Sequence, residues 1–76
     1  MVKENIYLQT LSDLLAERGM SKKDLSDRAG LSESMLSTIY RRNSIPRIKT
    51  LIRICNALGI KLSEFFERVE SVIIEK

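Results

Sequence analysis

The sequence predicts a single all-α domain of five helices, and three observations support that prediction. Apolar residues recur three and four positions apart through most of the chain. Residues that start or stop helices stand between these segments, and no alternating pattern of convincing length, as a strand requires, occurs before Ser71. With 76 residues, 43% of them hydrophobic, the chain suffices for one globular domain of modest stability.

The first helix is predicted at about residues 5–18. Its apolar residues share one helical face: Tyr7, Leu8, Leu11, Leu14 and Leu15. Gly19 ends this helix, since a residue just past a helix commonly takes a left-handed backbone.

The second helix is short and is predicted to begin at about Lys22. Ser21 can cap its free backbone amides, and Asp24 three residues later completes a capping box. Met20 and Leu25 flank this cap at the spacing of a hydrophobic staple.

A third helix follows at once, because Ser32 is again a capping residue. Its inward face is marked by Leu36 and Ile39. A small residue, a turn glycine and two aliphatic anchors together predict a helix-turn-helix over residues 20–39: Ser26, Gly30, Leu36 and Ile39. The alternative is an ordinary helical hairpin in a small bundle.

The last two helices are predicted beyond a loop at residues 41–47. The fourth runs over about residues 48–58 and ends at Gly59. Its expected apolar stripe is Ile48, Leu51, Ile52, Cys55 and Leu58, in which Cys55 is a small core residue. The fifth helix holds Leu62, Phe65 and Phe66.

The segment over residues 20–39 resembles the phage-repressor-like (Cro/repressor, XRE-like) helix-turn-helix family. Further matches are the loop proline Pro46, the start of a fourth helix at residues 49–51, and the closing segments at residues 55–60 and 62–66. The resemblance covers about residues 5–67. It implies a five-helix repressor-like DNA-binding domain. We expect a single domain over residues 1–76, with its core at about residues 5–67 and residues 68–76 as a short C-terminal extension for dimerisation.

Positive charge is concentrated on this motif. Residues 18–53 carry nine basic and three acidic side chains, whereas residues 1–17 and 54–76 are each net acidic. A solvated surface more often mixes both signs, so the asymmetry favours a polyanionic partner.

Outward positions of the third helix are the candidates for contacting bases. Leu36 and Ile39 fix the inward face, and the resemblance adds the helix-opening serine, so the predicted base-reading residues are Ser32, Glu33, Ser34, Ser37 and Thr38. Short polar side chains let a helix enter a major groove about 12 Å wide. The Glu33 carboxylate can accept a hydrogen bond from cytosine N4; alternatively, its charge near the start of the helix interacts favourably with the helix dipole. The serines can equally contact phosphate.

Contacts to the DNA backbone or minor groove are expected from residues flanking that helix: Lys22, Arg41, Arg42, Asn43, Ser44 and Arg47. In the resembled family the position of Lys22 usually holds a phosphate-binding glutamine, and that of Arg47 an arginine near the minor groove. The alternative for Arg42, and for Lys23, is a simple solvent-exposed charge.

Two departures from the family pattern give further expectations. A family arginine and glutamate that pair with each other are replaced together by Leu15 and Tyr40, which we expect to pack against each other. The family glycine after the third helix is replaced by Arg42, so Asn43 is the expected left-handed residue.

The last ten residues fit either a helix or a short strand. Together with the fifth helix, these residues include more apolar side chains than the end of a small domain usually exposes. Half of these apolar side chains can complete the core, and the other half predict a surface that binds a partner. The expected homodimer interface is Phe65, Phe66, Val69, Val72, Ile73 and Ile74. A homodimer would match a palindromic operator, with recognition helices about 34 Å apart.

Other classes of protein find little support. One cysteine and no histidine argue against a disulfide, a zinc site or a catalytic base, and no cofactor or small-molecule ligand is evident. There is no apolar run of about 18 residues, so a cytoplasmic protein without a membrane partner is expected. Two hypotheses remain: a sequence-specific DNA-binding transcriptional regulator, in the first instance a repressor, and a protein-interaction module such as an antitoxin-type helical domain.

Overall fold

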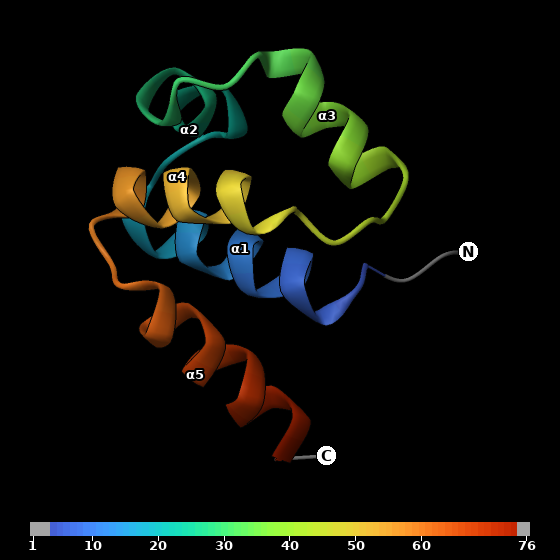
Figure 1. Ribbon diagram of the computed structural model, residues 1–76, viewed down its shortest axis with the longest axis vertical. Coiled ribbons are helices and arrows are strands. Elements are labelled where there is room, and N and C mark those ends of the chain that lie inside the picture. Colours follow the sequence, from blue (N-terminus) through green and yellow to red (C-terminus); the bar gives the residue numbers. More distant parts are fainter. Residues whose placement is uncertain (1–3, 75–76) are drawn as a thin grey trace.

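The computed structural model describes residues 4–74, the last of them by its backbone alone. In this part of the chain it has five helices and no strand: α1 (Ile6–Arg18), α2 (Lys22–Ala29), α3 (Glu33–Arg41), α4 (Ile48–Leu58) and α5 (Leu62–Ile74). The all-α prediction is confirmed. Along the long axis, α2 and α3 lie at one end and α5 at the other, with α1 and α4 between them (Figure 1).

Local capping explains where α1, α2 and α3 begin. The Asn5 side chain accepts from the Leu8 amide, and Ser21 and Asp24 form the expected capping box. Ser32 caps α3 by accepting from the Met35 amide at 3.1 Å. Since each cap lies within four residues of its partner, these boundaries follow from the sequence.

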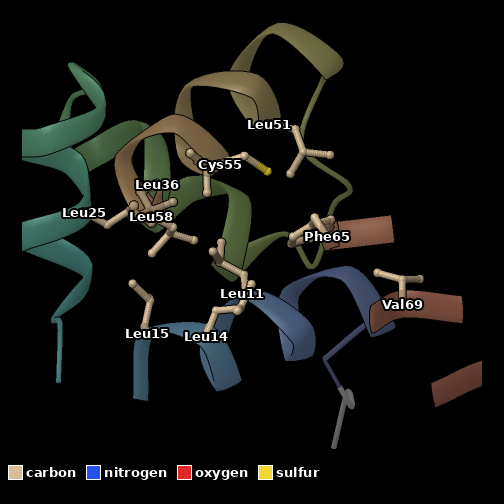
Figure 2. Packing of buried hydrophobic residues seen from close by; sticks show 11 residues of the cluster. Leu11, Leu14, Leu15, Leu25, Leu36, Leu51, Cys55, Leu58, Phe65 and Val69 are labelled. Atoms are coloured by element: carbon tan, nitrogen blue, oxygen red, sulfur yellow. The ribbon is translucent and has the colours of Figure 1, made fainter. Parts of the chain in front are cut away.

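One hydrophobic core joins all five helices (Figure 2). Its buried members are Leu11, Leu14, Leu15, Leu25, Leu36, Leu51, Ile54, Cys55, Leu58, Phe65 and Val69. Each fully buried leucine or phenylalanine contributes about 1.5–3 kcal/mol relative to exposure, so the positions of α2 and α3 depend on this shared core.

The predicted stripe of α4 was wrong at two positions. Ile48 and Ile52 are exposed by 53% and 41%, while Ile54 is fully buried. Two overlapping apolar stripes share Cys55 on this helix, and packing against α2 and α5 selects the one that contains Ile54. Cys55 is a buried core residue as expected, and burial raises the pKa of its thiol.

Helix α5 continues through the segment that was left open between helix and strand. Phe65 and Val69, one turn apart, are buried against the core and hold this helix along α1. On the surface, the Arg68 guanidinium donates two hydrogen bonds, of 2.7 and 2.8 Å, to the Glu17 carboxylate of α1. Residues 68–74 are therefore part of the folded helix, although residues 75–76 lie outside the described residues.

Candidate nucleic-acid interface

The turn between α2 and α3 sets the direction of the candidate recognition helix. Gly30 has φ +69°, a left-handed conformation that is costly for a residue with a Cβ atom. Directly after it, the Leu31 amide donates to the Ser26 carbonyl at 2.9 Å. Ser26 is 1% exposed, so a small side chain occupies the place where α2 enters the core, and Leu36 anchors α3 from the other side.

The predicted base-reading residues of α3 follow one another around its outward side, and some of them line a hollow. Ser32, Glu33, Ser34 and Ser37 are exposed and Thr38 is half-buried. Three of them, Ser32, Ser34 and Thr38, line one hollow between α3 and the following loop. Glu33 and Ser37 are exposed but lie outside that lining.

This hollow, which we call the α3 hollow, has a volume of about 510 Å³. Besides the hydroxyl residues, its lining includes Met35 of α3, Ile45 of the loop and Thr50 of α4. Met35 and Ile45 are 46% and 59% exposed, and neither was among the predicted contact residues. The exposure of Met35 could have been predicted from the sequence, because this residue lies about 100° around the helix from the inward Leu36. The exposure of Ile45 could not, since helical periodicity does not fix the conformation of a loop.

Basic side chains surround the hollow and the start of α2. Arg42 and Arg47 line the hollow, and Arg41 is exposed at the last residue of α3. Lys22, the first residue of α2, places its ammonium Nζ 3.7 Å from the centroid of the Tyr40 ring. Lys22 thus lies at the start of α2, Arg41 and Arg42 at the end of α3, and Arg47 at the start of α4.

Asn43 and Ser44 have intramolecular roles that the sequence prediction missed. Asn43 is left-handed as expected, with φ 52°, and its Oδ1 accepts from the Asn5 amide at 2.7 Å. Asn5 Nδ2 in turn donates to the carbonyls of Asn43 and Ser44, at 2.9 and 3.1 Å. The Ser44 amide and hydroxyl both donate to the Ile39 carbonyl. The Asn43 side chain therefore holds the loop against the start of α1, and the Ser44 side chain holds it against α3.

Tyr40, one of the two residues expected to replace a family ion pair, joins three helices. Its hydroxyl lies 3.0 Å from Ser12 Oγ of α1, and burial, the main cause, raises the pKa of the phenol. Leu15 is in the core and Tyr40 packs against that core, while a direct contact between the two stays a prediction. The tyrosine therefore joins α1, α2 and α3 through a hydroxyl, a ring face and apolar packing.

The predicted dimer interface needs a correction at two residues. Phe65 and Val69 are 1% and 3% exposed within this single chain, so they complete its own core and are unavailable to a partner. Phe66 and Ile73 are 37% and 56% exposed and Val72 is half-buried. The side chain of Ile74 lies outside the described residues.

Residues 4–74 show no sign of a metal site or of a membrane-spanning helix. In that part of the chain, histidine, cysteine and acidic side chains form no group of three or more that could hold a metal ion. No helix in that part of the chain has the length and apolarity needed to cross a membrane.

Comparison with known proteins agrees with this geometry. A family described as the Cro/C1-type HTH DNA-binding domain matches residues 10–71. The HTH-type transcriptional regulator PuuR of Escherichia coli strain K12 is 35% identical over 60 residues, which cover 79% of this chain and 32% of PuuR. The HTH-type transcriptional regulator SutR of the same strain is 36% identical over 62 residues, which cover 82% of this chain and 35% of SutR.

The chain thus spans about a third of the length of these curated relatives. No solved structure matched. Because the family match covers most of the chain and includes α2, Gly30 and α3, the protein belongs to the Cro/C1-type helix-turn-helix DNA-binding domain family.

Proposed function

We propose that this chain binds double-stranded DNA sequence-specifically, with α3 in the major groove, and acts as a transcriptional regulator. The observation that carries the proposal is the α3 hollow, in which Ser34 and Thr38 lie beside Arg42 and Arg47. Hydroxyl groups bond to base edges or phosphates, and arginine binds phosphate oxygens in a bidentate manner. PuuR and SutR are both named HTH-type transcriptional regulators, which supports the same proposal.

Backbone contacts are proposed for Lys22, Arg41, Arg42 and Arg47, because these exposed cations flank α3. Residues 18–53 have a local net charge of +6 within a chain of net charge +3. Such a field attracts a polyanion, and each phosphate contact releases condensed counterions from the duplex. Binding is therefore expected to weaken steeply as salt is raised.

We also propose a homodimer on a palindromic operator. Phe66, Val72 and Ile73 provide the apolar residues of α5 that the core leaves partly accessible. Since α5 lies at the opposite end of the long axis from α2 and α3, a contact through α5 leaves both recognition helices open to DNA (Figure 1). Repression is the proposed direction, and a reporter gene carrying the selected site tests it.

The decisive experiment is selection of bound duplexes from random DNA, followed by salt titration of the affinity. Each phosphate contact contributes about −0.9 to the slope of log affinity against log salt. The variant K22M should lower that slope by about one contact, whereas K61M, which removes an exposed lysine at the start of α5, should not. A flat salt response together with equal binding of selected and random duplexes would contradict DNA recognition and favour a protein-interaction module.

A further inference from the structure

We propose that Met35 and Ile45 form an apolar wall that receives thymine 5-methyl groups, so that thymine at fixed positions is part of what this chain recognises. This inference rests on the proposed DNA binding. It goes further by assigning two contact residues outside the base-reading set and by naming the base that they favour.

The wall consists of two of the exposed large apolar side chains of the described residues. Met35 is 46% and Ile45 is 59% accessible, although both carry large apolar side chains. They line the same hollow as Ser34 and Thr38, on the surface that α3 presents outward. An apolar group placed there gains free energy only if a ligand covers it, because exposed apolar surface is disfavoured in water.

The charges around the hollow select the kind of ligand. Arg42 and Arg47 lie in the same lining, so the occupant has to combine negative charge with an apolar group. By contrast, the lining of the hollow beside α5 has no excess of positive charge, because it holds three glutamates as well as two arginines: Glu17, Glu64, Glu67, Arg18 and Arg68. In the major groove the thymine methyl is the apolar group on the base edges, and it lies close to backbone phosphates. Duplex DNA therefore meets both requirements of the α3 hollow.

The hydroxyl groups of Ser34 and Thr38 do not by themselves specify one base. A serine or threonine hydroxyl both donates and accepts, so Ser34 and Thr38 can bond to several different base edges. An apolar wall discriminates differently, since it gains from a methyl group and gains nothing from a bare ring position. Thymine recognition by Met35 and Ile45 would thus reduce the number of base sequences that Ser34 and Thr38 alone accept.

The test replaces each thymine of a selected site by deoxyuridine, one at a time, which removes the methyl and keeps the hydrogen-bonding groups. Wild-type affinity should fall about fourfold at one or two positions in each half-site, the value expected for one buried methyl group. In M35A or I45A the loss at the matching position should disappear, whereas M35L, which stays apolar, should keep it. I52A is the matched control, because Ile52 is 41% exposed but lies outside the hollow, and it should retain the full wild-type pattern.

Three results would overturn the proposal. Uracil could be tolerated at every position, the uracil penalty could persist in both M35A and I45A, or the selected half-sites could lack a shared thymine. Each of these leaves binding to the selected site intact, so it is distinct from failure of the proposed function, in which selected and random duplexes bind alike. Unfolding curves of the variants confirm that they are folded, as the exposure of both side chains leads us to expect.

Discussion

The Lys22 ammonium lies 3.7 Å from the centroid of the Tyr40 ring, so the first residue of α2 is held against the end of α3. The ring is itself fixed, because the Tyr40 hydroxyl lies 3.0 Å from Ser12 Oγ and the side chain packs on the core. A cation over an aromatic face gains about 0.5–1 kcal/mol at an exposed site. A lysine proposed to contact phosphate is thus oriented before DNA arrives.

We expect Tyr40 to position Lys22 for its phosphate contact. In a double-mutant cycle on DNA affinity, K22M should weaken binding less in the Y40L background than in the wild type, since loss of the aromatic ring leaves Lys22 unrestrained. Y40F, which retains the ring, should preserve most of the coupling.

The control for this cycle is the next residue. Lys23 is an exposed lysine on the same turn, and K23M should be additive with Y40L. Additivity of K22M with Y40L would show that Tyr40 has only a structural role.

Asn43 is expected to be sensitive to the identity of its replacement. N43A loses the hydrogen bond from the Asn5 amide and also leaves an alanine at φ 52°, so it should lower the free energy of unfolding by about 1–3 kcal/mol. N43G loses the same bond but relieves the backbone strain, so its loss should be smaller. Urea unfolding measures the free energy of unfolding of both variants. If N43G loses as much stability as N43A, or more, this account of the loop is wrong.

Acid is expected to weaken the fold through two surface carboxylates. Hydrogen bonds from the Arg68 side chain lower the pKa of Glu17, and the Ser21 backbone amide lowers the pKa of Asp24. Because both folded-state pKa values lie below the ordinary values of 4.5 and 3.8, their stabilisation is present above those values and is lost as the pH falls through the lowered ones. The variant E17Q/D24N should therefore show a flatter dependence of unfolding free energy on pH below about 5. Parallel curves for variant and wild type would rule out this origin of the acid sensitivity.

Neighbouring phenylalanines in α5 are expected to behave differently. F65A removes a buried side chain and should cost about 3–5 kcal/mol, enough to unfold much of a domain this small. F66A/I73A should leave an isolated chain folded and weaken self-association, because both side chains are exposed. Sedimentation at several protein concentrations, combined with unfolding curves, separates the two effects. If F66A/I73A associates as strongly as the wild type, the dimer does not form through this face of α5.

The base-reading and backbone positions were only partly accessible to sequence reasoning. Leu36 marks the inward side of α3, so its outward polar residues could be assigned from helical geometry alone. Asn43 and Ser44 could not, because their partners Asn5 and Ile39 are chosen by the path of the loop. The apolar wall of Met35 and Ile45 was missed for the same reason, since it forms only when the loop folds beside α3.

The sequence by itself determined the all-α class, both ends of α2 and the start of α3, because Ser21, Gly30 and Ser32 act on backbone groups within a few residues. Only the tertiary structure decided which of two overlapping apolar stripes α4 buries, and which phenylalanine of α5 enters the core. Helical periodicity fixes the angle between side chains on one helix, but the face that is buried depends on how neighbouring helices pack against it.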